Sequence, residues 1–286
     1  MQPKILVTGA PGNVGTEVVR QLEAKGVPFR VGAHSPEKAR RQLGSVEIVP
    51  FDFTEPETYT AFEGIEAMFL VRPPALANVQ RDIAPAVWAA VGAGVTHIVF
   101  LSLQGVEDNP VVPHRKIEEL ILETGVDYTF LRAGFFMQNL STQHREEIRD
   151  EDVLPLPVGK AKTSFIDTRD IAAVAVEAMT TDGHANQKYT LTGAEALDYY
   201  EVAAKLSAVL GREIRYTDPA PPVFFWKQAQ RTDWQYALVV TGLYTITRFG
   251  NAEAVSPDVQ RVLGRPPISF EQYAQDHRAC WEREPS

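Results

Sequence analysis

Short apolar runs alternate with segments of helical periodicity along the first half of the chain. Runs typical of buried strands lie at 5–7, 27–33, 47–51, 67–71, 97–101 and 128–131. Between them, apolar residues recur every three or four positions, as at Val14, Val18 and Leu22, which is the spacing of one helix face. Further helices are expected at 36–42 and 56–62, along the stretch bearing Ile83, Val87 and Val91, and around 117–121. This alternation predicts an α/β fold, a Rossmann-type doubly wound parallel sheet with helices on both faces.

The pattern loosens after about residue 133, which indicates a second region. Strands are expected at 165–166 and 188–192, with a helix at 169–179 between them. Later segments comprise a helix capped by Asp198 and ended by Gly211, a turn at 219–222, an aromatic helical stretch at 224–249 and a last helix begun by Ser269. We expect a dinucleotide-binding Rossmann core of residues 1–133, with 160–193 contributing to it. Residues 134–159 and 194–286 then form a smaller, mostly helical substrate-binding region.

Charge and composition narrow the classes of partner. The net charge of −9 argues against nucleic acid, because phosphate binding needs a basic face. Cys280 is the single cysteine, so no intrachain disulfide forms. No apolar run approaches the roughly 20 residues that span a bilayer, and no signal peptide precedes the first strand. We therefore expect a cytoplasmic protein with a small-molecule substrate and no membrane partner, and the oligomeric state stays open.

A glycine-rich loop follows the first strand and opens the first helix. Gly9, Gly12 and Gly15 are spaced as in dinucleotide-binding turns, where they permit a tight turn, close approach of a pyrophosphate and close helix packing. The pyrophosphate then lies at the positive helix N-terminus. The residues expected to bind the cofactor here are Gly9, Pro11, Gly12, Asn13, Val14 and Gly15.

The end of the second strand bears on the choice between NADP and NAD. Sites selective for NAD usually carry Asp or Glu there, whereas this chain has His34 and Ser35, with Lys38 nearby. Nothing at this position repels a 2′-phosphate, so NADP is expected, with NAD possible; alternatively, these residues form a solvated basic helix face. Asp52 either accepts hydrogens from the adenine amino group or caps the following helix. The remaining cofactor contacts are expected from Phe53, Val71, Arg72, Pro73, Ser102 and Leu103.

Several longer motifs resemble those of the NmrA-like family, a branch of the atypical short-chain dehydrogenases/reductases. They are TGAPGNVG at 8–15, HSPEKA at 34–39, FDFTEPE at 51–57, HIVFLSLQG at 97–105, HRKIEELILETGVDYTFLRAGFFMQN at 114–139, FIDTRDIA at 165–172, YTLTG at 189–193 and GRPPISFEQY at 264–273. The resemblance implies NAD(P) binding by the glycine loop, with His34 at the adenosine ribose, and a C-terminal region that closes a substrate cleft. The family includes reductases of quinones, azo dyes and imines, and also sensors of the nicotinamide redox state.

The Tyr-x-x-x-Lys pair of short-chain dehydrogenases is absent, because Pro110 and Val112 stand four residues before His114 and Lys116. His114 and Lys116 are the candidate proton donors, with Ser102 beside the nicotinamide; alternatively they are structural or solvated, and water protonates the product. Asp167 and Asp170 precede a helix and are expected to be structural. No metal-binding spacing is present, so no metal is expected.

The substrate-binding candidates are the aromatic residues Phe135, Phe136, Phe224, Phe225 and Trp226, whose alternative is core or lid packing. The sequence favours an NAD(P)-dependent oxidoreductase that reduces a small, apolar, aromatic or quinone-like acceptor. The missing tyrosine favours a rival from another class, a non-catalytic NAD(P)-binding redox sensor or regulator. A third reading is a family member recruited to unusual redox chemistry in secondary metabolism.

Overall fold

The computed structural model describes residues 4–283, which form two compact units. Unit 1 contains the residues up to Ala133 together with Thr168–Leu191 and Asp258–Arg265. Unit 2 contains Gly134–Asp167, Thr192–Pro257 and the residues from Pro266 onward. These boundaries differ from the expected ones, since 160–167 and 192–193 belong to unit 2 and 258–265 to unit 1.

Unit 1 is built on a seven-stranded sheet whose strands all run parallel. Its order is β10 (Gln187–Leu191), β6 (Asp127–Ala133), β5 (His97–Leu103), β4 (Ala67–Leu70), β1 (Ile5–Val7), β2 (Phe29–Ala33) and β3 (Ile48–Pro50). The order reverses between β1 and β4, so the chain leaves these two neighbouring strands in opposite directions. In doubly wound sheets, ligands bind outside the carboxyl ends of the strands at such a switch point.

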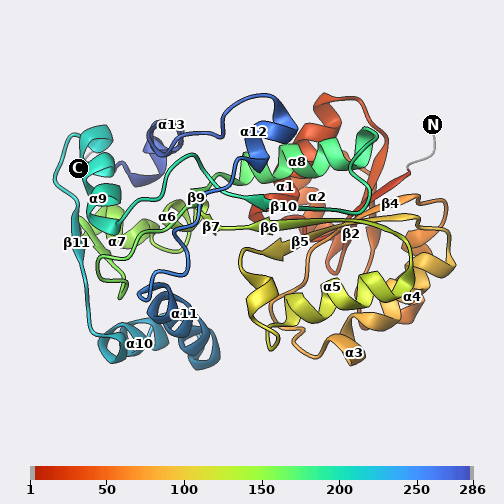
Figure 1. Ribbon diagram of the computed structural model, residues 1–286, viewed down its shortest axis with the longest axis horizontal. Coiled ribbons are helices and arrows are strands. Elements are labelled where there is room, and N and C mark those ends of the chain that lie inside the picture. Colours follow the sequence, from red (N-terminus) through yellow and green to blue (C-terminus); the bar gives the residue numbers. More distant parts are fainter. Residues whose placement is uncertain (1–3, 284–286) are drawn as a thin grey trace. The chain divides into compact units, whose positions relative to one another are not determined.

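Helices cover both faces of this sheet. Figure 1 shows α1 (Asn13–Ala24), α8 (Thr168–Thr180) and α12 (Asp258–Leu263) on one face, and α3 (Val79–Asp82), α4 (Ala84–Gly92) and α5 (Pro113–Thr124) on the other. The unit also contains α2 (Pro36–Leu43) and the 3₁₀ helices η1 (Pro56–Phe62) and η2 (Val106–Asp108). The long helix expected around 83–91 is interrupted at Ile83, because Pro85 cannot donate a backbone hydrogen bond to the preceding turn.

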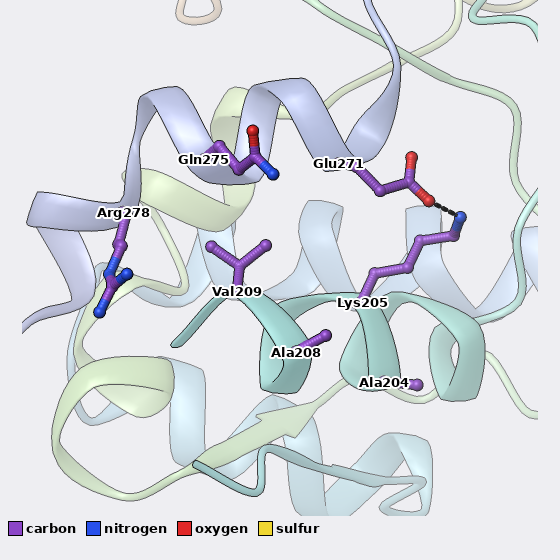
Figure 2. Close-up of a pocket in the computed structure, with 7 residues that line it drawn as sticks. All are labelled: Ala204, Lys205, Ala208, Val209, Glu271, Gln275 and Arg278. Atoms are coloured by element: carbon purple, nitrogen blue, oxygen red, sulfur yellow. Dashed lines mark hydrogen bonds and ion pairs between the residues drawn. The ribbon is translucent and has the colours of Figure 1, made fainter. Parts of the chain in front are cut away.

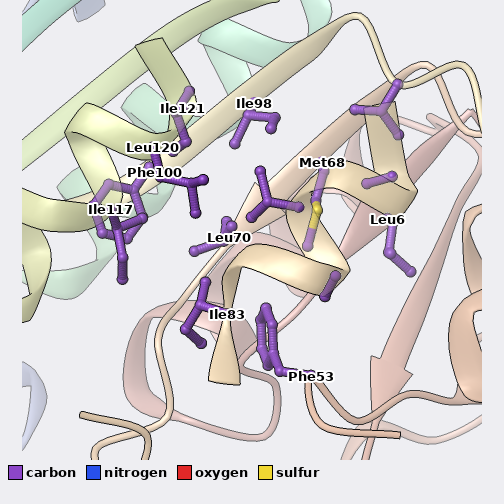
Figure 3. Packing of buried hydrophobic residues seen from close by; sticks show 14 of the residues in the cluster. Leu6, Phe53, Met68, Leu70, Ile83, Ile98, Phe100, Ile117, Leu120 and Ile121 are labelled. Carbon is purple, nitrogen blue, oxygen red and sulfur yellow. The ribbon is translucent and has the colours of Figure 1, made fainter. Parts of the chain in front are cut away.

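A buried apolar core between the sheet and α5 explains why this helix packs against strands β4 and β5. Leu70, Ile98 and Phe100 of the strands meet Ile117 and Ile121 of α5, and all five side chains are completely buried (Figure 3). Burial of each such side chain contributes roughly 1.5–3 kcal/mol relative to exposure. This packing fixes α5 over β5 and so sets where its first turn, the region of His114, lies.

Unit 2 has two short parallel strand pairs and a separate core. The strands are β7 (Phe135–Phe136) with β9 (Phe165–Ile166), and β8 (Val153–Pro155) with β11 (Arg215–Thr217). The helices are α6 (Gln138–Ser141), α7 (Arg145–Asp150), α9 (Tyr199–Leu210), α10 (Pro221–Ala229), α11 (Trp234–Thr247), α13 (Phe270–Asp276) and the 3₁₀ helix η3 (Arg278–Trp281). Among residues 4–283, no helix combines the length and apolar character needed to cross a membrane.

Two expectations for this region are wrong in detail. The stretch 224–249 is not continuous, because Asp233 caps a new helix by accepting a hydrogen bond from the backbone N–H of Tyr236. The prolines at 221 and 222 do not form a turn but begin α10, where a missing N–H costs nothing.

A buried histidine lies in the core of unit 2. The Nε2 atom of His144 is 2.8 Å from the hydroxyl oxygen of Tyr244, and both side chains are almost completely buried. Burial, with a smaller contribution from the positive charge of Arg231, lowers the pKa of His144 to about 4. The folded protein therefore holds this ring neutral at pH values where an unfolded chain would protonate it.

Because the pKa of His144 is lowered in the folded protein, we expect the free energy of unfolding to decrease in acid. Its stabilising contribution is complete above the unfolded pKa of about 6.5 and is lost as the pH falls toward the folded value of about 4. At pH 5 the expected loss is about 2 kcal/mol. Urea unfolding at pH 7.5 and pH 5.0 measures it, with His144→Gln as the non-titrating comparison. An equal pH dependence in both proteins would contradict the assignment.

Candidate functional site

The glycine loop is a tight turn, and at each of its three glycine positions a Cβ would be too close to a neighbouring atom. Gly9 has a φ of 74°, and a Cβ there would lie 2.5 Å from the Cβ of Val71 at the end of β4. The backbone N–H of Gly12 donates to the carbonyl of Gly9 over 2.8 Å. A Cβ on Gly12 would lie 2.7 Å from that same carbonyl oxygen, and one on Gly15 would lie 2.6 Å from it. The loop thus closes against the carboxyl ends of β1 and β4.

The N-terminus of α1 is open to an anion. Gly12 is the N-cap and provides no capping side chain, and the first turn contains no acidic residue. By contrast, α9 is closed by a capping box between Asp198 and Glu201. Pro11, Gly12 and Asn13 are exposed. Free N–H groups at a helix N-terminus suit a phosphate group, so the residues present fit the pyrophosphate of a dinucleotide.

The ends of β2 and β3 are joined by a contact that the sequence analysis did not foresee. The Nδ1 atom of His34 lies 2.7 Å from Oδ2 of Asp52, while Oδ1 of Asp52 accepts hydrogen bonds from the backbone N–H and the hydroxyl of Thr54. An acid does therefore lie beside the position after β2, which corrects the expectation that nothing there repels a 2′-phosphate. Glu55 brings a further carboxylate to the group, with its nearest ligand atom within 4.8 Å of the other two. We assign no metal to the group, because exposed acidic groups of this kind are common without an ion.

Other residues expected at the cofactor have different environments. Ser35 and Lys38 are exposed at the start of α2, whereas the side chain of Phe53 is buried in the core of unit 1 and packs edge-on against Phe51. The buried side chain of Phe53 leaves only its backbone atoms for the expected cofactor contact, which stays a prediction. Leu103, at the end of β5, is partly exposed.

Arg72 shapes the loop that follows β4. Its guanidinium donates hydrogen bonds to the carbonyl oxygens of Pro73, Pro74 and Leu76. Burial lowers the pKa of this guanidinium. Arg72 thereby holds residues 73–76 in one conformation next to the switch point. It acts through the loop backbone, and its expected contact with the cofactor stays a prediction.

Ser102 belongs to a buried charged network and does not present its hydroxyl at an open edge. Its hydroxyl donates to Oε1 of Glu118 over 2.6 Å, and Arg132 donates to both oxygens of Glu118 over 3.1 and 2.7 Å. Arg132 also lies 3.2 Å from a carboxylate oxygen of Glu107. Ser102, Glu118 and Arg132 are all buried. The hydroxyl of Ser102 is therefore engaged by Glu118 of α5, and its expected place beside the nicotinamide stays a prediction.

His114, a candidate proton donor, stands in the first turn of α5 and in an apolar setting. Its ring stacks on Phe100 with centroids 5.9 Å apart. Burial, and then the positive charge of Arg72, lower the pKa of His114 to about 4. The ring is therefore neutral at pH 7. Lys116 is exposed on the same helix.

The aromatic substrate candidates differ in their exposure. Phe224 is completely packed in the core of unit 2 against Tyr244, which matches the alternative of core packing. Phe135 and Phe136 are partly buried in β7, and Trp226 on α10 is 66% exposed. A pocket lined by residues of α9 and α13 is drawn in Figure 2. Its lining includes Lys205 and Glu271 and none of the expected aromatic residues, so it offers no evident redox chemistry.

The two aspartates near the start of α8 have structural partners. Oδ1 of Asp170 lies 2.7 Å from Nη1 of Arg265, and Asp170 is completely buried. Asp167 accepts a hydrogen bond from the side-chain amide of Gln138. Both contacts agree with the expectation that these aspartates are structural.

A parallel sheet with a glycine loop at its switch point and an open helix N-terminus defines the class of Rossmann-fold nucleotide-binding proteins. The model of the NmrA-like family matches residues 1–261, and the chain belongs to this family. It is 37% identical to an NAD(P)H azoreductase of Xenophilus azovorans, over 97% of this chain and 99% of that one.

Two further similarities come from a curated protein and a solved structure. The chain is 33% identical to a (4-alkanoyl-5-oxo-2,5-dihydrofuran-3-yl)methyl phosphate reductase of Streptomyces griseus, over 98% and 100% of the two chains. The structure of Citrobacter sp. triphenylmethane reductase, complexed with NADP(H), superposes with a TM-score of 0.85 over 95% of this chain and 99% of that one, at 24% identity. The structural likeness confirms the fold.

Proposed function

We propose that this chain, an NAD(P)-dependent oxidoreductase, reduces a small, largely apolar, aromatic or quinone-like acceptor with NADP(H), NAD(H) being the alternative cofactor. The observation that carries the proposal is the open N-terminus of α1 behind Gly12. It offers backbone N–H groups to a pyrophosphate at the switch point of the sheet. When bound there, the nicotinamide supplies a hydride.

The apolar character of the acceptor is supported by two observations. The relative from Xenophilus azovorans is named an azoreductase, and azo compounds are electron-poor and conjugated. In unit 2, α10 and α11 expose apolar side chains such as Trp226 and Val239. Phe135 and Phe136 are only partly buried and add aromatic surface. We assign the apolar contacts of the acceptor to unit 2.

The chemistry needs no strong protein acid. Hydride addition to a conjugated acceptor leaves a delocalised anion, and water then supplies the proton. The neutral, stacked ring of His114 favours this route over a histidine acid. In this proposal, residues of the chain bind and orient the two reactants and exclude competing water from the transfer step.

His114→Gln and Lys116→Gln are therefore expected to keep turnover within about tenfold of the wild-type value, because removal of a true general acid costs roughly 10²–10⁴-fold. Steady-state rates at saturating cofactor measure this, with the thermal midpoint as the check that each variant is folded. A loss of 10²-fold or more in folded His114→Gln would reinstate His114 as the proton donor.

The proposal is tested by the oxidation of NADPH and NADH against a panel containing an azo dye, a quinone, an enone and an imine. We expect turnover with at least one apolar, conjugated acceptor. Tight cofactor binding without turnover of any acceptor would support the rival function, a redox-sensing regulator. The absence of binding to either cofactor would overturn both.

A further inference from the structure

The contact between His34 and Asp52 fixes where the imidazole carries its hydrogen. Burial acts to raise the pKa of Asp52, but the hydrogen bonds from Thr54 and the contact with His34 outweigh it, and the pKa is lowered. An ionised carboxylate only accepts hydrogen bonds. Because Nδ1 of His34 lies 2.7 Å from Oδ2, this nitrogen must be the one that carries the hydrogen.

The other ring nitrogen, Nε2, can then act either as a hydrogen-bond acceptor or as a donor, depending on the protonation of the ring. In the neutral ring, Nε2 is a bare acceptor, and in the protonated ring it is a donor with positive charge. The side chain of His34 is 76% exposed, and no hydrogen bond within residues 4–283 engages Nε2. This atom is therefore free to meet a ligand at the carboxyl end of β2.

The carboxyl end of β2 is the place where the adenosine ribose of a dinucleotide lies in this class of fold. Resting on the proposed NAD(P) binding, we propose that Asp52 determines cofactor selectivity by holding the hydrogen on Nδ1 of His34. The neutral Nε2 then accepts a hydrogen bond from the ribose 2′-hydroxyl of NADH. The protonated Nε2 donates one to the 2′-phosphate of NADPH. Asp52 is thus a positioning residue, and it acts on the cofactor through His34.

The charges around His34 come from two segments. On the segment after β3, Asp52 and Glu55 carry negative charges that repel a 2′-phosphate. On the first turn of α2, Glu37 opposes a phosphate, and Lys38 attracts it. With two carboxylates close by, the phosphorylated cofactor depends on the charge of the imidazole. The preference for NADPH over NADH should therefore grow as the pH falls.

Dissociation constants of NADH and NADPH at pH 8.0 and pH 6.0, measured by fluorescence titration, test this proposal. Histidine changes its charge within this range, and one charge-assisted hydrogen bond corresponds to about a tenfold change in the ratio of the two constants. His34→Gln is the reference, because it retains only the titration of the 2′-phosphate itself. Relative to this reference, we expect the wild-type preference for NADPH to rise about tenfold between pH 8.0 and pH 6.0.

Two further variants distinguish the effect of the His34–Asp52 hydrogen bond from the effect of nearby negative charge. Asp52→Asn removes the anchor of Nδ1 and is expected to flatten the pH dependence and to improve NADPH binding at pH 8.0. Any general effect of this change on the adenosine cancels in the ratio of the two constants. Glu55→Gln removes a nearby charge but leaves the hydrogen bond from Nδ1 of His34 to Asp52 intact. This variant should therefore keep the rise in NADPH preference between pH 8.0 and pH 6.0.

The outcomes distinguish this inference from the proposed function. If neither cofactor binds at any pH, the proposed function fails. If both bind but the wild-type ratio follows that of His34→Gln, only the role of His34 and Asp52 is overturned. If the NADPH preference of Asp52→Asn still rises between pH 8.0 and pH 6.0 as in the wild type, Asp52 does not determine cofactor selectivity.

Discussion

Replacing Glu118 by glutamine is expected to lower the free energy of unfolding by about 3–5 kcal/mol, the usual cost of removing one partner of a buried ion pair. Glu118 is 2% exposed and is bonded to Arg132 through both carboxylate oxygens. Without that charge, the guanidinium of Arg132 would stay buried with only the more exposed Glu107 beside it. Glutamine keeps one carbonyl oxygen, so Ser102 and Arg132 would share a single neutral acceptor in place of two carboxylate oxygens.

The neighbouring residue supplies a matched control. Glu119 lies on the same helix and pairs with Arg115 in an exposed i, i+4 arrangement, so Glu119→Gln should cost only about 0.3–0.5 kcal/mol. Urea unfolding of the wild type and both variants at pH 7.5 gives the comparison. Similar losses in the two variants would show that the buried network does not stabilise the fold.

The first half of the fold was predictable because its strands are buried on both faces. Segments such as Ile5–Val7 and Ala67–Leu70 are continuous apolar runs, which few other structures produce. Two short strands of unit 2, β8 and β11, gave no such signal, whereas β9 at Phe165–Ile166 was expected. β8 and β11 have three residues each, and β11 alternates with exposed polar positions. Their pairing depends on tertiary packing, which no local pattern contains.

The candidate site divides in the same way. The glycine loop was predictable because all its residues are contiguous and their spacing expresses one local turn. The pairs His34–Asp52 and Glu118–Arg132 were not foreseen, because each joins different strands or a strand and a helix. A signal for the second pair did exist. Glu118 lies on the buried side of α5 and Arg132 interrupts an apolar strand, so both charges had to find partners inside.

Gly12→Ala is expected to weaken NADPH binding by about 100-fold or more, equivalent to about 3 kcal/mol. The added Cβ would lie 2.7 Å from the carbonyl oxygen of Gly9, so the turn must open and its N–H groups must move away from a pyrophosphate. Gly92→Ala in α4 is the matched control, since nothing lies within 4 Å of a Cβ there. Fluorescence titration with NADPH measures both, and wild-type affinity in a folded Gly12→Ala protein would remove the loop from the cofactor site.

A second variant tests cofactor binding at the N-terminus of α1 even if Gly12→Ala disturbs folding. Asn13→Asp adds a negative charge at the first residue of α1, which has no acidic residue in its first turn. Without ligand, this charge should stabilise the helix by about 0.3–1 kcal/mol through the helix dipole. The same charge repels a pyrophosphate at that N-terminus, so the affinity for NADPH should fall by about tenfold. Opposite changes in thermal midpoint and in affinity are expected only if the anion lies on these N–H groups. A gain in stability with unchanged affinity would place the cofactor elsewhere.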